Sequence, residues 1–280
     1  MYNMFRKREA LCLRILNTIF FVLMVAVNII AEWLPLNNIT TAQVSAQHDT
    51  LMTPPGFTFI IWGIIYLGLF FFILYQNGVF LKKSEGENPD IIHAVSIFFI
   101  ISSAENIAWV IAWHYDYIVL CFVLIFAIWG SLLIAYTRLQ REINNKRERF
   151  FVQVPFSIYL AWISVAMAPN LIAMLKSSTG LLGLTELQWT MTAIVCLALF
   201  TEYILFSFRD IAFALTAAWA FGGIFYRYAK NIGSPDLQTD MMVLLSVVMG
   251  VLLMSLFIVA WMQHYKPQMT QGTGHRNLNH

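Results

Sequence analysis

Charged residues are scarce in this chain. Asp, Glu, Lys and Arg make up only 11% of its 280 residues, whereas they make up about 25% of a typical soluble domain. The net charge of +2 is too small to indicate a surface for nucleic acid, and hydrophobic residues make up 59% of the chain. Composition therefore indicates a polytopic membrane protein with no nucleic-acid partner.

Reactive side chains are equally sparse. Cys12, Cys121 and Cys196 lie far apart in or beside apolar runs and form no CxxC pair, so we expect neither a disulfide framework nor a zinc site. The sequence contains no Ser-His-Asp series, no paired histidines at ligand spacing and no phosphate-binding loop. We therefore expect no enzyme activity, no metal site and no cofactor.

Long apolar runs define the fold class. A helix needs roughly 20 apolar residues to cross a bilayer, and lipid requires such a segment to satisfy its own backbone hydrogen bonds. The first run is too long for the apolar core of a signal peptide, so we expect it to be retained. We predict an all-α, polytopic membrane helix bundle with eight spans, at 11–34, 56–80, 91–114, 117–138, 152–175, 187–207, 210–228 and 241–264.

Basic residues are distributed unevenly over the expected loops. Of the 17 Lys and Arg residues, only Lys176, Arg227 and Lys230 fall on one side of the expected bundle. The remainder fall on the side that holds both termini. Since basic loops stay in the cytoplasm, we expect a multi-pass protein of a bacterial cytoplasmic membrane with both termini cytoplasmic.

Three polar segments connect or follow these spans. Residues 35–55 contain no Lys or Arg and are long enough to cover the outer mouth of the bundle as a lid, although an ordinary solvated connection is the alternative. Residues 138–150 are dense in charge and are expected to be a cytoplasmic linker attracted to anionic membrane lipids. Residues 265–280 are polar and aperiodic, which predicts a disordered cytoplasmic tail.

Aromatic side chains form a stripe on the second span. Pro55, Phe59, Trp62 and Tyr66 follow one another at spacings of four, three and four, so they share one helical face. Such a stripe is typical of helix packing. It is also typical of one wall of a pocket for a flat apolar ligand.

The fifth span carries a second stripe. Pro155, Tyr159, Trp162, Ala166 and Asn170 share one face at spacings of four, three, four and four. The small Ala166 leaves space one turn from an indole and one turn from an amide. A lipophilic pocket combines these ingredients, and close helix packing through a small residue is the alternative.

A polar and aromatic face lies inside the third span. It carries Ser102, Glu105, Asn106, Trp109 and Trp113. A charged carboxylate at the depth of Glu105 is expensive, so the side chain must face protein or a water-filled cavity. Glu105 is either a proton- or cation-coupled site, a polar ligand anchor, or a neutral group hydrogen-bonded to a neighbouring helix.

These stripes together resemble the TspO/MBR family, the tryptophan-rich sensory proteins that include the mitochondrial translocator protein. The resemblance covers roughly residues 11–175. It implies five helices around a pocket for tetrapyrroles and other flat lipophiles, capped by the loop after the first helix. The matching positions are Pro54, Pro55, Gly56, Phe57, Trp62 and Tyr66 in the second span, Asn106 and Trp109 in the third, and Pro155, Phe156, Trp162, Ala166 and Asn170 in the fifth.

The chain departs from the family pattern in several places. Phe57 stands where the family has Trp, Glu105 where an apolar residue is usual, and Pro169 where Leu is usual. Three further spans follow the first five, as in extended bacterial members. We therefore divide the chain into a five-helix core at 1–175, three additional helices at 176–264 and the tail at 265–280. The additional helices either flank the core, replace a dimer partner or form part of the pocket.

The leading hypothesis is an integral-membrane receptor or sensor for a tetrapyrrole-like, porphyrin-like or sterol-like ligand, with a homodimer left open. The alternative is a proton-coupled secondary transporter of a small lipophilic or anionic solute that uses Glu105. The expected ligand-binding residues are Trp62, Tyr66, Glu105, Asn106, Trp109, Tyr159, Trp162, Ala166 and Asn170.

Overall fold

The computed structural model describes residues 2–33, 36–79, 89–230 and 235–271, and these residues form helices and no strands. Seven of its helices are long and apolar enough to cross a membrane, which confirms the all-α polytopic bundle. The elements are α1 (Tyr2–Trp33), η1 (Leu36–Asn38), α2 (Thr41–Gln47), η2 (Gly56–Ile60), α3 (Ile61–Gln76), α4 (Pro89–His114), α5 (Ile118–Glu142), α6 (Lys146–Glu148), η3 (Arg149–Gln153), α7 (Val154–Ser178), η4 (Gly180–Gly183), α8 (Glu186–Phe208), α9 (Ile211–Ala229) and α10 (Pro235–Gln271).

The seventh expected span, 210–228, is helix α9, but it does not belong to that set of seven. Its glycines, tryptophan and tyrosines contribute no hydropathy, and Arg227 lowers the mean further. Two of the expected polar segments are also more helical than predicted. Residues 265–271 continue α10, and residues 272–280 lie outside the described part of the chain. Within 138–150, α5 runs to Glu142 and the helix resumes as α6 and η3.

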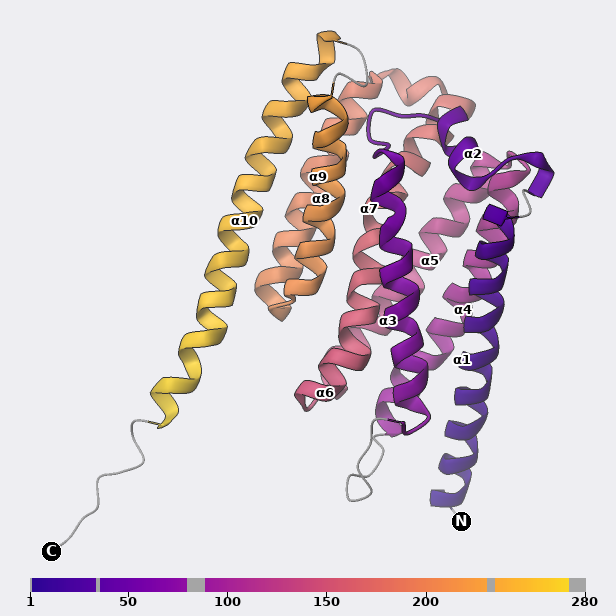
Figure 1. Ribbon diagram of the computed structural model, residues 1–280, viewed down its shortest axis with the longest axis vertical. Coiled ribbons are helices and arrows are strands. Elements are labelled where there is room, and N and C mark those ends of the chain that lie inside the picture. Colours follow the sequence, from indigo (N-terminus) through magenta and orange to yellow (C-terminus); the bar gives the residue numbers. More distant parts are fainter. Residues whose placement is uncertain (1, 34–35, 80–88, 231–234, 272–280) are drawn as a thin grey trace, which may run out of the picture.

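Helices α1, α3, α7, α5 and α4 form a closed ring, in which each helix contacts the next and α4 returns to α1. Helices α8 and α9 lie beside α7, outside this ring, and α10 packs on their far side (Figure 1). Helix α1 begins and α10 ends at one end of the bundle, which we call the terminal end (Figure 1). Helix α2 covers the opposite end, which we call the lid end.

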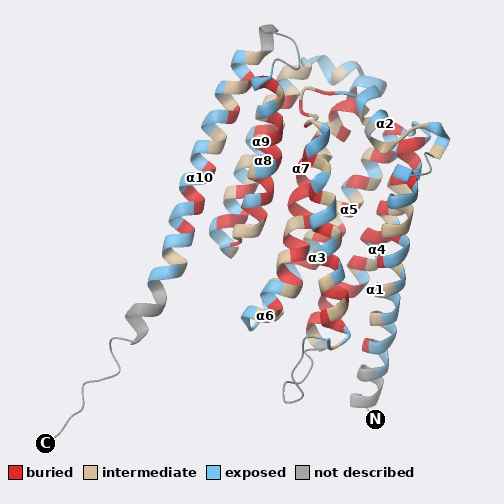
Figure 2. Cartoon of the chain, viewed as in Figure 1, coloured by how far each residue is buried: buried red, intermediate tan, exposed pale blue. Residues whose placement is uncertain are grey.

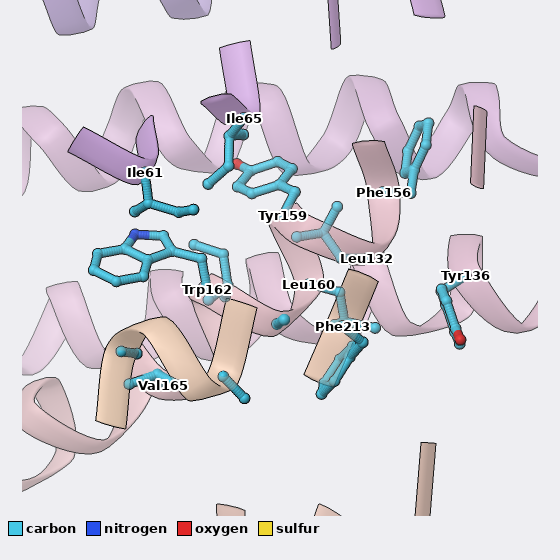
Figure 3. Close-up of a cluster of buried hydrophobic side chains, with 14 of the residues drawn as sticks. Ile61, Ile65, Leu132, Tyr136, Phe156, Tyr159, Leu160, Trp162, Val165 and Phe213 are labelled. Atoms are coloured by element: carbon cyan, nitrogen blue, oxygen red, sulfur yellow. The ribbon is translucent and has the colours of Figure 1, made fainter. Parts of the chain in front are cut away.

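Helix α7 is the centre of the structure because it contacts α3 and α5 of the ring and also α8 and α9. Its side chains are buried over most of its length, whereas α1 and α10 expose much of their surface (Figure 2). Figure 3 shows Tyr159 and Trp162 projecting from α7 toward Ile65 and Ile61 of α3. The stripe expected on the fifth span therefore faces the inside of the ring.

Side chains are tightly packed in the half of the ring nearer the terminal end. Phe72, Phe99 and Phe156 are buried and meet edge to face, with ring centroids 5.2–5.7 Å apart. Nearer the terminal end, the Asn17 amide donates to Gln76 Oε1 at 2.8 Å and lies 2.9 Å from Ser96 Oγ. These contacts join α1, α3 and α4, and packed side chains occupy this part of the ring.

A buried carboxylate fastens the last three helices to the ring. Asp210 is only 5% exposed. It accepts hydrogen bonds from Tyr136 Oη at 2.8 Å and Ser157 Oγ at 2.6 Å, and it caps α9 by accepting from the Phe213 amide at 3.1 Å. One side chain therefore ties the start of α9 to α5 and α7.

Candidate functional site

The lid half of the ring encloses a cavity with two chambers. The outer chamber has a volume of about 630 Å³ and lies between the ends of α1 and α3. The inner chamber, of about 70 Å³, lies deeper between α3, α4, α5 and α7. The chambers adjoin each other, since they share lining residues, among them Phe59, Trp62 and Trp109. The size falls within the roughly 300–1,000 Å³ typical of small-molecule pockets.

Aromatic rings form the walls of this cavity. Trp62 meets Trp162 nearly at right angles, with centroids 6.4 Å apart, and Phe59 meets Trp162 edge to face at 5.7 Å. Trp62 also stacks on Tyr66 at 5.5 Å. Ala166, one turn beyond Trp162, adds a small side chain to the inner chamber. The helical spacing of the two stripes therefore brings them together on one cavity.

The polar groups of the cavity are mostly engaged with each other. Asn28 Nδ2 donates to Asn106 Oδ1 at 2.8 Å, and Trp109 Nε1 donates to Asn170 Oδ1 at 3.2 Å. The side-chain oxygens of Asn106 and Asn170 thus already accept hydrogen bonds within the protein. In contrast, Tyr66 lines the outer chamber, and its hydroxyl is buried without a hydrogen-bonding partner among the described residues.

Seven of the nine expected ligand-binding residues line the cavity: Trp62, Tyr66, Asn106, Trp109, Trp162, Ala166 and Asn170. The other two, Glu105 and Tyr159, are not among the residues that line either chamber. Glu105 instead accepts a hydrogen bond from Ser131 Oγ at 3.3 Å, between α4 and α5. Tyr159 lies beneath the cavity, where its ring meets Trp62 at 6.0 Å. Their roles in binding stay predictions.

The connection after α1 folds over the cavity, and we call its described residues, 36–55, the lid. Its helix α2 begins with a capping box, in which Thr40 and Gln43 bond each other's backbone amides. Thr41 and Ser45 of α2, and His48 directly after it, line the inner chamber. His48 Nε2 lies 2.6 Å from Asp116 Oδ1, which holds this part of the lid to the turn between α4 and α5.

Three charged residues, Glu32, Asp49 and Arg227, line the outer chamber, and none of them was expected there from the sequence. Asp49 of the lid and Arg227 of α9 both line it, and they form a salt bridge at 2.5 Å. Their positions are separated by 178 residues, so no local pattern links them. The one available signal was that Arg227 is among the three basic residues expected on the lid side.

Comparison with known proteins places this arrangement in a family. A model of the family described as TSPO-like proteins matches residues 14–262. The match begins in α1 and ends in α10, so it includes both the ring and the three helices beside it. No curated protein and no solved structure matches the chain. Because the family model covers far more than half of the sequence, the chain belongs to the TSPO-like protein family.

Proposed function

We propose that this membrane protein is a receptor or sensor that binds a flat lipophilic ligand, tetrapyrrole-like or sterol-like, in the cavity of its lid half. The observation that carries the proposal is a chamber of about 630 Å³ walled by the indoles of Trp62 and Trp109, with Trp162 in the inner chamber. An apolar pocket with few free polar groups selects flat, apolar molecules by burial and stacking.

Two observations favour binding over proton-coupled transport. Phe72, Phe99 and Phe156 fill the ring beneath the cavity, so a ligand that enters from the lid end meets a packed core. Glu105, the residue on which the transport alternative rests, is bonded to Ser131 and is not among the lining residues. A transporter site needs its coupling residue and its substrate at the same place.

The proposal is tested by titrating the protein in lipid nanodiscs with protoporphyrin IX and, separately, with a fluorescent sterol. We expect saturable binding of at least one probe. Ala166→Phe places a phenyl ring in the inner chamber and should weaken that binding at least tenfold, which corresponds to about 1.4 kcal/mol. Equilibrium dialysis is the readout, since it does not depend on tryptophan emission.

Trp129→Phe is the matched control. The Trp129 indole donates to Ser164 Oγ at 3.0 Å and packs on Phe200 of α8, away from the cavity. Its replacement should leave affinity unchanged. Binding without saturation, or equal affinity in Ala166→Phe and the parent protein, would show that the aromatic stripes serve packing alone.

A further inference from the structure

We propose that Arg227 of α9 is a positioning residue of the binding site, which clamps the lid shut and thereby sets the rate at which ligand enters and leaves. This inference rests on the proposed function, because it concerns the same cavity. It also gives the last three helices a role: they complete the mouth of the site that the five-helix ring encloses.

Arg227 is fully engaged with the lid. Its Nη1 and Nη2 atoms donate to the two carboxylate oxygens of Asp49 at 2.7 and 2.5 Å. Nη1 also donates to the backbone carbonyls of Thr50 at 3.1 Å and Thr53 at 2.8 Å. The side chain is only 11% exposed. A planar guanidinium that binds a carboxylate with two parallel bonds fixes orientation as well as distance.

Neighbouring residues of α8 and α9 hold the same stretch of lid. Tyr228 Oη donates to the Leu51 carbonyl at 2.7 Å. The Leu51 amide in turn donates to Glu186 Oε1 at 2.8 Å, and Lys176 of α7 bonds the other oxygen of Glu186 at 2.9 Å. Residues 49–53 are therefore bonded through both side chain and backbone to elements outside the lid.

Helix α9 also packs directly on the Pro-Pro-Gly segment that begins the second span. Trp219 Nε1 donates to the Thr58 carbonyl at 3.0 Å. The ring of Phe57 meets Trp219 at 6.0 Å and Tyr226 at 5.2 Å, both edge to face. Phe57, which replaces the family's Trp, thus contacts α9 rather than the cavity.

The position of these contacts makes Arg227 the residue that controls the mouth. Asp49, Thr53 and Arg227 line the outer chamber together, so the clamp lies at the edge of the space that the ligand would occupy. The far side of the lid is held separately, by His48 and Asp116. Loss of Arg227 would therefore remove four hydrogen bonds to residues 49–53 and loosen this stretch, while Leu51 keeps its bonds to Tyr228 and Glu186 and the α2 end stays attached.

The test compares Arg227→Gln with Lys230→Gln in nanodiscs. Lys230 is exposed, lies at the same end of α9 and contacts the Tyr226 ring rather than the lid. Hydrogen exchange of residues 41–53 reports the lid, and stopped-flow displacement of protoporphyrin IX reports ligand release. We expect Arg227→Gln to raise the rate of lid hydrogen exchange and the rate of ligand release at least tenfold each. Lys230→Gln should leave both rates unchanged.

Two further variants separate the clamp from a general loss of structure. Asp49→Asn removes the partner charge from the lid and leaves α9 unchanged, so it should reproduce the faster exchange. Arg227→Lys keeps a cation near Asp49, so its lid should exchange more slowly than that of Arg227→Gln. A purely steric role of the arginine would not produce this difference.

Unchanged hydrogen exchange in both Arg227→Gln and Asp49→Asn would overturn the clamp. Faster lid exchange in a protein that binds neither probe would support the clamp and refute the proposed function. Saturable binding of a probe, with lid exchange and ligand release unchanged in the variants, would support the proposed function and refute the clamp.

Discussion

Gly223→Ala tests the closest approach between α9 and the ring. A Cβ atom at Gly223 would lie 2.4 Å from Thr58 Oγ1 and 2.8 Å from Thr58 Cγ2. Thr58 is fully buried, so its side chain has little room to move away. Extra volume in such a place costs about 1–3 kcal/mol. We therefore expect α9 to dock less stably on the start of α3.

The adjacent Gly222 provides the matched control, because a Cβ there would meet only Met249 Cε, at 3.8 Å. Replacing a helical glycine by alanine contributes about 0.5–1 kcal/mol of stability by itself. Both variants gain this amount, so the difference between them isolates the clash. Gly222→Ala should be neutral or stabilising, and Gly223→Ala should be less stable than Gly222→Ala by about 1–3 kcal/mol.

The assay is reversible unfolding in mixed micelles, followed by circular dichroism. Thr58→Ala removes both offending atoms and leaves Thr58 Cβ at 3.2 Å. The double variant Gly223→Ala/Thr58→Ala should therefore recover most of the loss, with a coupling of about 1 kcal/mol or more. Equal stability of Gly222→Ala and Gly223→Ala, together with zero coupling, would refute the close approach of α9.

Two predictions concern carboxylates that hydrogen-bond between helices. Glu105→Gln should fold nearly as well as the parent protein, since an amide oxygen can accept the same hydrogen bond, whereas Glu105→Lys should not assemble; size-exclusion chromatography of the two variants decides this. Asp210→Ala leaves Tyr136 and Ser157 without this acceptor and α9 without its cap. The free energy of unfolding in micelles should therefore fall by about 3 kcal/mol or more. Asp240 is exposed, so Asp240→Ala is the control and should lower it hardly at all.

Hydropathy predicted nearly every crossing helix, because a segment that crosses a bilayer must satisfy its own backbone hydrogen bonds and therefore forms a helix. Spacings of three and four residues placed Trp62, Trp109 and Trp162 each on a stripe of its own helix, and the resemblance to the TspO/MBR family implied that the three stripes surround one cavity. Glu105 shows the limit of that argument. Adjacent residues differ by about 100° around a helix, so Asn106 faces the cavity while Glu105 faces Ser131 of α5.

The contacts of the lid could not be predicted from local pattern. Arg227 and Asp49 are far apart in sequence, and their pairing depends on how α9 docks against the ring. The close approach of Gly223 to Thr58 likewise joins residues far apart in sequence, so helical periodicity does not predict it. The division of the chain into 1–175 and 176–264 stays a prediction, although the bonds to Arg227 and Asp210 cross that boundary.

Helix α9 has a consequence for how the protein is made. A segment leaves the translocation channel for lipid unaided only if it is apolar enough, and α9 is less apolar than the other crossing helices. Contacts with α7, α8 and α10 compensate for this inside the finished protein. We therefore expect insertion of α9 to be assisted by neighbours on both sides in the sequence, one of which is synthesised after it. A nascent chain can close its ring early, but Arg227 and Tyr228 can secure the lid only after α9 has been synthesised.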